Sequence, residues 1–417
     1  MLFRFFITLS AIIISIPSFA QVTEEMTPPV DIKTIIFTGD TQQSQLPIIK
    51  LGDRIVLEFD ALNANEDDYY YKIEHFDYDW TPSNLSKAEY MSGYDNQRLR
   101  TYENSFNTFQ IYSHYNLTIP NEYTRGLIKS GNYMLQIFND YDEMVFSRKF
   151  MIFETNASVG VFIRTSRDVK YLYEKQTVDI NISSSSIQFN NPAETVKTLI
   201  VQNNNLNTAI SNVKPQYTLG NELVYKYTTE TSFWGGNEFL NFENKDIKGS
   251  NSAIQFIELN ELYNNFLFTN YVRGNNPYTY NPDIDGNFVI TALDTERPWI
   301  EADYAWIHFS LLPDANLMNK NIYVYGNFNN YETNEENKMI FNESRGVYEA
   351  QLLLKQGFYN YKYVLVDDND EIQEGAISGN YNQTDNNYKV LVYYRDLGAR
   401  YDRLVGVGES NSVNITN

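Results

Sequence analysis

The chain has 417 residues, no cysteine and a formal net charge of −21, so disulfide bonds are excluded and a nucleic-acid partner is disfavoured. Aromatic residues make up 15% of the chain, which is too many for a disordered solvating tail. The fold must be held by its hydrophobic core alone, and the length suits about two to four domains.

The first twenty residues predict an export signal. A basic start is followed by an apolar run from Phe5 to Ile16 and by small residues up to Ala20. This order is typical of a secretory signal peptide, and the run is too short for a stable membrane span. We therefore expect residues 1–20 to be removed and the mature chain to begin near Gln21.

Alternation of apolar and polar residues dominates the rest of the chain. It is clearest over residues 55–61, 109–119, 178–182 and 359–365, as in half-buried strands. Helical periodicity is limited to short pieces such as Phe256 to Phe268. The pattern predicts an all-β fold of tandem immunoglobulin-like β-sandwich domains rather than one closed barrel.

Changes in composition suggest where these domains meet. Residues 155–158 have the character of a linker, and residues 294–299 interrupt the strand pattern again. The predicted organisation is a signal peptide at 1–20, an N-terminal β-sandwich at 21–155, a second β-sandwich at 156–297, a C-terminal domain at 298–400 and a flexible tail at 401–417.

One aromatic strand changes its alternation phase. Apolar residues occupy odd positions over residues 71–74 but even positions from Phe76 to Trp80. A shift by one residue moves the apolar set to the other face, which predicts a β-bulge near His75. We expect Trp80 to be mostly buried in the first sandwich.

The sequence contains no recognisable catalytic motif. His75, His114 and His308 are scattered, none accompanies a nucleophile elbow, and without cysteine they do not form a zinc site. We therefore predict no catalytic residue, no cofactor and no metal ligand, and hence a protein that is not an enzyme. A glycosidase-type pair of carboxylates stays open, because so many Asp and Glu residues are present.

Two acidic segments are candidates for calcium binding. The segment from Asn281 to Gly286 begins like a helix-loop-helix calcium loop, but Ala292 occupies the position of the bidentate Glu, so a turn with Asx hydrogen bonds is favoured. The segment from Asp367 to Glu371 has the character of a hairpin loop, and weak calcium binding there stays open.

An ordered series of short motifs runs through the first predicted domain. The motifs are Tyr71-Lys-Ile-Glu-His, Asp79-Trp80-Thr-Pro-Ser, Glu89-Tyr-Met-Ser-Gly93-Tyr, Tyr102-Glu-Asn-Ser105-Phe-Asn107-Thr108, Tyr112-Ser-His-Tyr115-Asn-Leu-Thr-Ile-Pro120, Ser130-Gly131-Asn-Tyr133 and Arg148-Lys-Phe-Met-Ile152. With this series, residues 32–154 resemble the first domain of the plug protein family of the type IX secretion system of Bacteroidetes-type bacteria. The matching structural positions are Trp80, Gly93, Ser105, Asn107, Tyr115, Pro120, Gly131 and Tyr133.

The resemblance implies a location and a partner. It implies a non-enzymatic periplasmic protein, associated with the inner face of the outer membrane and bound to the giant translocon barrel of the type IX secretion system. In that family the plug closes the barrel from the periplasmic side. The motifs fall on scaffold positions, so they do not identify the surface that contacts the barrel.

The C-terminal domain carries a second resemblance. Residues 322–331 and 357–363 are similar to the early-set immunoglobulin-like domains that bind glycogen or starch. In those domains a Trp that stacks on glucose often occupies the position of Tyr331. The resemblance implies an alternative function, a periplasmic or surface carbohydrate-binding β-sandwich protein with Tyr331 as its sugar-binding residue, although a structural role for Tyr331 is favoured.

Overall fold

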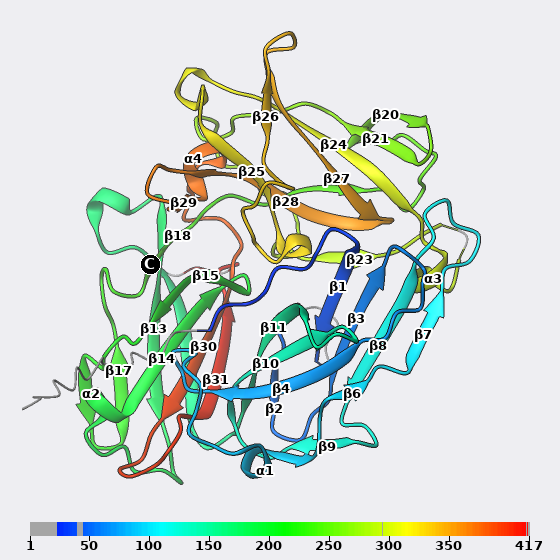
Figure 1. The fold of residues 1–417 in the computed structure, drawn as a ribbon. Coiled ribbons are helices and arrows are strands. Elements are labelled where there is room, and N and C mark those ends of the chain that lie inside the picture. Colours follow the sequence, from blue (N-terminus) through cyan, green and yellow to red (C-terminus); the bar gives the residue numbers. More distant parts are fainter. Residues whose placement is uncertain (1–22, 40–44, 294, 414, 416–417) are drawn as a thin grey trace, which may run out of the picture.

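The computed structural model describes residues 23–39, 45–293, 295–413 and 415, so the predicted signal peptide lies outside them. Strands account for 47% and helices for 6%, which confirms the all-β class. The larger sheets pack in pairs as three sandwiches (Figure 1). We call them the first sandwich (residues 32–153), the second sandwich (residues 158–234 and 387–411) and the inserted sandwich (residues 240–378).

The first sandwich closes around stacked aromatic rings. Phe59 lies parallel to Tyr115 at 5.1 Å, and Tyr133 lies nearly parallel to Phe150 at 5.3 Å. One sheet has the order β1 (Ile32–Thr38), β3 (Ile55–Ala61), β8 (Ser113–Ile119), β7 (Thr101–Asn104), and the other has the order β2 (Ile48–Lys50), β11 (Met144–Phe153), β10 (Gly131–Phe138), β4 (Tyr70–Phe76), β6 (Gln97–Arg98). Helix α1 (Lys87–Tyr90) and the pair β5 (Met91–Gly93) and β9 (Thr124–Leu127) complete this part of the chain.

The second sandwich is built from two stretches of chain that lie far apart in the sequence. Its core is rich in β-branched residues such as Val178, Ile180, Ile200 and Val390. One sheet has the order β12 (Ser158–Thr165), β13 (Lys175–Ser183), β17 (Glu222–Tyr225), β16 (Tyr217–Leu219), with β18 (Ser232–Trp234) also on β13. The other has the order β15 (Asn205–Ser211), β14 (Val196–Gln202), β30 (Asn387–Tyr394), β31 (Arg403–Asn411); short helices are η1 (Val169–Tyr171) and α2 (Pro192–Thr195).

The inserted sandwich occupies the chain between β18 and β30. Its first sheet has the order β19 (Leu240–Glu243), β28 (Gly357–Val366), β23 (Phe288–Ile290), with β25 (Asn321–Tyr325) and β29 (Ile372–Gln373) also on β28. Its second has the order β20 (Ile254–Leu259), β21 (Tyr263–Leu267), β24 (Tyr304–Leu312), β27 (Val347–Lys355), β26 (Ile340–Asn342), with β22 (Asn270–Tyr271) on β24. Its short helices are α3 (Pro298–Glu301), η2 (Ala315–Leu317), η3 (Asn327–Asn329) and α4 (Gly375–Ser378).

The strand pairing differs from the predicted division at residues 297 and 400. Strand β19, expected in the second domain, pairs with β28, whereas β30, expected in the C-terminal domain, pairs with β14. The third sandwich is therefore inserted into the second. The predicted flexible tail also needs correction, because β31 pairs with β30 along its length and buries Leu404 and Val405.

Two local expectations are wrong for identifiable reasons. Strand β4 pairs with β10 without a register shift, so there is no bulge at His75. The phase change arises because both faces of this sheet are covered: Ile73 faces the core of the first sandwich, whereas Phe76 faces the second. The short helical piece from Phe256 to Phe268 is the β20–β21 hairpin, in which Phe256 pairs with Phe266.

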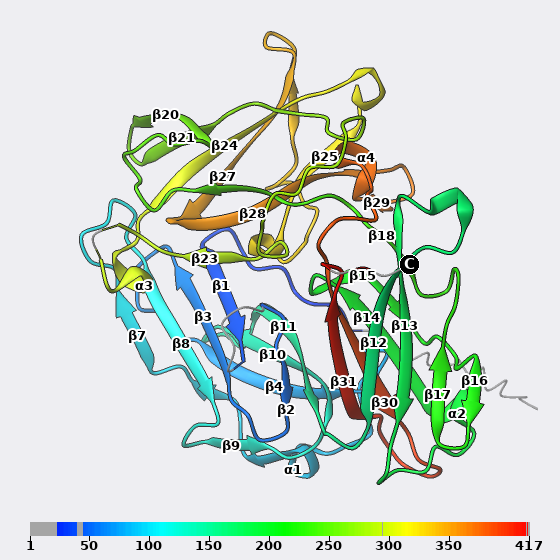
Figure 2. The same cartoon turned by 180° about the vertical axis from the view of Figure 1, so that it is seen from behind.

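The three sandwiches form one packed body. The four sheets of the first and second sandwiches lie in a row, and the inserted sandwich lies along one side of that row, at the top of Figure 1. The view from behind shows the same arrangement, with β30 and β31 next to the sheet that contains β10 (Figure 2). The junctions between sandwiches therefore bring together residues from distant parts of the sequence.

Candidate functional site

The motif positions lie in the scaffold of the first sandwich. Tyr115 and Tyr133 are fully buried, and their hydroxyls each donate to a backbone carbonyl at 2.8 Å, that of Asp67 and that of Lys129. Pro120 directly follows β8 and has a cis peptide bond before it. These positions stabilise the sandwich, and they do not converge on a pocket.

Gly93 and Gly131 are required by backbone conformation and space. Their φ angles are +96° and +137°, where residues with a Cβ are strained. A Cβ on Gly93 would lie 2.0 Å from the carbonyl oxygen of Tyr123, and one on Gly131 would lie 2.6 Å from Nε2 of His75. Both motif glycines therefore allow close packing rather than ligand binding.

Ser105 and Asn107 shape the loop between β7 and β8. The backbone N–H of Tyr112 donates to Ser105 Oγ at 3.0 Å, and the N–H of Ser105 donates to the carbonyl of Tyr112 at 2.8 Å. Asn107 has φ +59°, a conformation that Asn tolerates well. The loop is thus held in one defined shape.

Trp80 is buried, with 9% of its surface exposed, but its environment differs from the one expected. Its ring belongs to a cluster between the first and second sandwiches, with Phe76 and Met151 on one side and Leu199 on the other. Lys149 Nζ lies 4.8 Å from the ring centroid, a cation–π distance. The motif tryptophan therefore joins two sandwiches instead of filling the core of one.

The histidines occupy structural positions. His75 contacts Ser83 Oγ at 2.8 Å, and its other nitrogen faces the carbonyl of Ser130 at 3.1 Å. Burial lowers the pKa of His75 to about 4, so it is a weak base. His308 Nε2 lies 2.9 Å from Asn264 Oδ1 and its ring stacks on Phe266 at 4.0 Å.

A buried ion pair joins the first and inserted sandwiches. Lys355 Nζ on β27 lies 2.7 Å from Asp60 Oδ2 on β3, and the two residues are 1% and 0% exposed. Asp60 also contacts His114 Nδ1 and accepts from the Tyr304 hydroxyl, each at 2.7 Å. We call this group the buried ion network.

Further contacts satisfy the remaining polar groups of the network. Lys355 Nζ donates to the carbonyl of Trp299 at 2.7 Å and lies 4.0 Å from the ring centroid of Tyr112. The Tyr304 hydroxyl lies 2.6 Å from Thr34 Oγ1. A buried charge is tolerated only when it is paired and hydrogen-bonded, and each member here meets that condition.

Burial and neighbouring charges shift the pKa values of these groups. Burial opposes ionisation of Asp60, but Lys355 and His114 outweigh it and hold the pKa of Asp60 below its usual value. Burial also opposes protonation of His114, but hydrogen bonds to Asp60 and Glu58 raise the pKa of His114. Burial lowers the pKa of Lys355 despite the attraction of Asp60. The network acts as a structural clamp between the two sandwiches.

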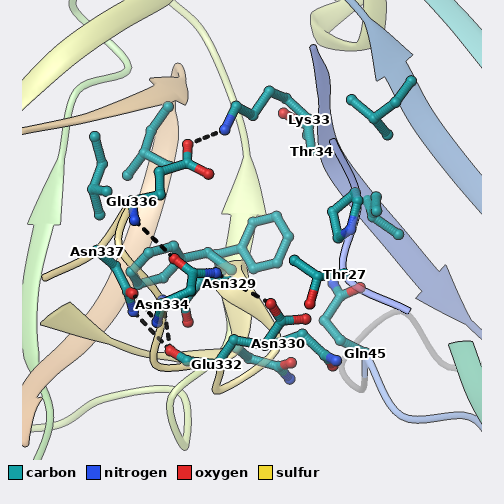
Figure 3. A pocket seen from close by; sticks show the side chains of 18 of the residues that line it. Thr27, Lys33, Thr34, Gln45, Asn329, Asn330, Glu332, Asn334, Glu336 and Asn337 are labelled. Atoms are coloured by element: carbon teal, nitrogen blue, oxygen red, sulfur yellow. Dashed lines mark hydrogen bonds and ion pairs between the residues drawn. The ribbon is translucent and has the colours of Figure 1, made fainter. Parts of the chain in front are cut away.

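A small cavity of mixed polar and apolar lining lies beside this junction, between the N-terminal segment and the Asn-rich chain around η3 (Figure 3). Its volume is about 100 Å³. An ion pair of Lys33 with Glu336 crosses it, and Asn337 Nδ2 donates to the carbonyl of Glu332 at 2.7 Å. Ligand pockets usually exceed about 300 Å³, so this cavity suits a few water molecules rather than an organic substrate.

Residues 32–154 match the family described as type 9 secretion system plug protein 1st domain. The chain belongs to the type IX secretion system plug protein family. The first-domain match covers the first sandwich, which contains Asp60 and Trp80. The matched domain therefore contributes Asp60 to the junction with the inserted sandwich and Trp80 to the junction with the second sandwich.

A solved structure extends the likeness to nearly the whole chain. It is the crystal structure of a hypothetical protein from Parabacteroides merdae ATCC 43184, with 34% sequence identity and a TM-score of 0.88. The alignment covers 93% of this plug-family chain and 98% of that one. No curated protein matches the chain.

Tyr331 has no exposed ring face on which a sugar could stack. It is 4% exposed and packs on Tyr325 at 5.1 Å, and its hydroxyl donates to the carbonyl of Asn203 at 3.1 Å. Its ring thus joins the inserted sandwich to the second. The carbohydrate alternative loses the residue on which it was based.

A cluster of carboxylates lies where the chain enters and leaves the inserted sandwich. Glu238 Oε1 accepts from the N–H of Asp385 at 3.2 Å, whereas Glu238 Oε2 is buried without a partner among the described residues. Asp283 Oδ2 accepts from the N–H of Phe239 at 2.6 Å. Glu238 thus binds the segment that leaves the inserted sandwich, and Asp283 binds the segment that enters it.

Crowding makes these acids hard to ionise. Burial, with repulsion from Asp283, Asp385 and Glu238, raises the pKa of Asp285 to about 7, although Lys389 opposes the shift. Burial also raises the pKa of Glu238, of Asp283 and of Asp385. The described residues contain no group of three or more His, Asp or Glu arranged to hold a metal ion.

The segment from Asp367 to Glu371 is the connection between β28 and β29. Asp367 Oδ1 accepts from the N–H groups of Asn369 and Glu371 at 2.9 and 3.0 Å, and Oδ2 accepts from Gln373 at 3.0 Å. These bonds lower the pKa of Asp367. The carboxylate is thus used to shape the hairpin, and calcium binding here stays an untested expectation.

Sequence reasoning missed the buried ion network. Asp60 and Lys355 lie on strands whose alternation resembles that of any half-buried strand, and they lie 295 positions apart in the sequence. No local signal identifies such a pair. Among the described helices, none has the length and apolar character needed to cross a membrane.

Proposed function

We propose that this protein is a non-enzymatic periplasmic plug of the type IX protein secretion translocon, closing the outer-membrane barrel from its periplasmic side. The proposal is carried by the match of residues 32–154 to the plug family. A barrel wide enough for folded cargo would leak unless it were blocked, and a plug supplies the block.

The packing of the three sandwiches supports this role. A body that blocks a wide pore must not deform, and domains joined by flexible linkers would not meet that demand. Here the first sandwich is tied to the inserted one by Asp60 and Lys355, and to the second by the cluster around Trp80. Such a body closes an opening as one piece.

The experiment measures outer-membrane leakage. Deleting the gene should leave cells viable and raise uptake of a large hydrophilic antibiotic, because barrels are no longer blocked. A strain that lacks both the plug and the barrel should return to wild-type uptake. Unchanged uptake in the single deletion would contradict gating and point to an assembly role.

Location and partner are tested separately. We expect the protein in the periplasmic and outer-membrane fractions, and its co-purification with the giant barrel in mild detergent. N-terminal sequencing of the cellular protein should begin near Gln21, and a sequence beginning at Met1 would contradict export by a cleaved signal.

A further inference from the structure

Five large apolar side chains are exposed along one side of the molecule, and we call them the apolar edge. They belong to the β7–β8 loop, the β20–β21 hairpin and helix α3, which lie near one another in both views (Figures 1 and 2). Scattered apolar residues are normal on a surface, whereas a group of them marks an interaction site. The residues and their exposed fractions are Phe106 67%, Phe109 55%, Ile111 58%, Leu259 51% and Trp299 38%.

Contacts between the two sandwiches make this group one surface. The N–H of Phe106 donates to the carbonyl of Ile300, next to Trp299, at 2.9 Å. The ring of Phe109 meets that of Tyr263 edge to face at 5.4 Å, and Leu259 lies opposite Tyr263 in the hairpin. The apolar edge therefore continues the interface between the first and inserted sandwiches out to the surface.

The loop that carries Phe106, Phe109 and Ile111 is fixed in this exposing shape. The buried carboxylate of Asp303 accepts from the N–H of Phe109 at 2.8 Å and from that of Gln110 at 3.1 Å. The loop backbone is therefore held at Phe106 by Ile300 and at Phe109 and Gln110 by Asp303. The exposed side chains cannot turn into the core without breaking these hydrogen bonds. A prearranged apolar surface binds a partner without a further ordering cost.

Charge around the apolar edge argues for a particular kind of partner. Exposed carboxylates of Glu258 and Glu261 lie on the hairpin, and Glu296 lies just before α3. Arg297 is paired with Glu103, so it does not neutralise them. A second copy of the chain would bring like charges together, whereas a partner with basic residues around an apolar centre would be attracted.

We propose that the apolar edge is the surface by which this protein docks on an apolar protein surface rimmed by Lys and Arg. This inference rests on the proposed function, under which that surface belongs to the translocon barrel. The β7–β8 loop, with its motif residues Ser105 and Asn107, then has a binding role as well as a structural one.

The experiment compares two double variants of the full-length mature protein. Phe106→Ser with Ile111→Ser removes two exposed side chains of the apolar edge. Tyr217→Ser with Leu219→Ser removes two comparably exposed side chains on β16 of the second sandwich, 56% and 65% exposed, and is the control. Binding is measured by surface plasmon resonance to the purified, detergent-solubilised barrel from a strain that lacks the plug.

We expect the edge variant to bind at least about tenfold more weakly, and the control variant to bind within about twofold of wild type. A third variant, Glu258→Lys with Glu261→Lys, should bind more weakly and lose part of the salt dependence. Melting temperatures of all variants should match wild type, since the changed side chains are exposed.

Each contrary outcome has its own meaning. If wild type binds the barrel and the edge variant binds equally well, the apolar edge is not the docking surface, and the proposed function stands. If wild type does not bind the barrel at all, the proposed function fails and this assignment of a partner fails with it. A wild-type dimer in ultracentrifugation that the edge variant abolishes would overturn the proposal and give the surface to a second copy.

Discussion

The first sandwich meets its two neighbours through different buried contacts. Toward the second sandwich it presents an apolar wall of Phe76, Trp80, Met134 and Met151, whereas toward the inserted sandwich it presents the charge of Asp60. Apolar burial is not directional and tolerates small displacements. A buried charge is directional, because any displacement of its partner leaves it uncompensated. The apolar wall supplies adhesion, and the ion pair fixes the orientation of the inserted sandwich.

The largest effect is expected from breaking the ion pair on one side. Lys355→Met removes the lysine partner of the buried Asp60 carboxylate, which keeps its contacts with His114 and Tyr304, and should cost about 3–5 kcal/mol of unfolding free energy. Denaturant titration measures the loss. Scanning calorimetry should also show the inserted sandwich melting ahead of the rest, whereas wild type should give one transition.

The double variant Asp60→Asn with Lys355→Met tests the interpretation, because it removes both charges and should recover more than half of that loss. Lys338→Met is the control: Lys338 pairs with the exposed Glu335, and losing such a pair costs less than about 1 kcal/mol. A loss for Lys355→Met no larger than that for Lys338→Met would show that the buried pair does not hold the sandwiches together.

The apolar wall is tested by Trp80→Ala. Removing a large ring between two sandwiches should cost about 3 kcal/mol, the lower end for aromatic-to-alanine changes, because Trp80 retains some exposure. The measurement is the urea midpoint at constant m-value. An unchanged midpoint would show that the Trp80 ring contributes little to stability. Phe76 and Met151 would then supply most of the stabilising contact between the two sandwiches.

The third junction, between the second and inserted sandwiches, should respond to pH. Because the pKa of Asp285 is raised to about 7, the folded state holds a proton that the unfolded state releases near pH 4, so stability should fall as pH rises from about 4 to 7. Asp285→Asn should remove about 1–2 kcal/mol of that fall. Asn suits the φ of +55° at this position, and melting temperatures at pH 5 and pH 8 for both proteins give the comparison. Parallel pH dependence in the two proteins would contradict the role of Asp285.

The smallest effect is expected from a polar bond within the apolar wall. The Tyr393 hydroxyl donates to Asn132 Oδ1 at 2.6 Å, with both side chains buried. Tyr393→Phe should cost about 1 kcal/mol, as for other buried hydrogen bonds. A cost as large as that of Trp80→Ala would mean that the wall, too, depends on directional contacts, and the contrast between the two faces would fail.

Local pattern was enough to predict the strands but not their partners. Alternation marked the strands around Leu57, Tyr115, Ile180 and Tyr361, and the all-β class follows from it. The insertion of one sandwich into another could not be predicted from local pattern, because Val196 pairs with Tyr394, a residue far away in the sequence. Composition changes near residue 297 coincide with α3, inside the inserted sandwich.

The candidate site shows the same limit. Burial of Trp80 was predicted correctly, yet the face on which it lies depends on a neighbour that the strand itself does not encode. The motif containing Ser105 and Asn107 was recognisable, but its exposure of Phe106 follows from a backbone hydrogen bond to Ile300, a residue of another sandwich. Family motifs locate a scaffold, and only the assembled fold locates surfaces.

The insertion also sets an order of events during synthesis. All strands of the first sandwich are present once Phe153 has emerged, but β14 lacks its neighbour β30 until the inserted sandwich has been made. In the interval Leu199 and Val201 would face water, were it not for the finished wall around Trp80 and Met151 on which they pack. The first sandwich thus offers these residues of β14 a complete packing surface before the strand that completes their sheet is available.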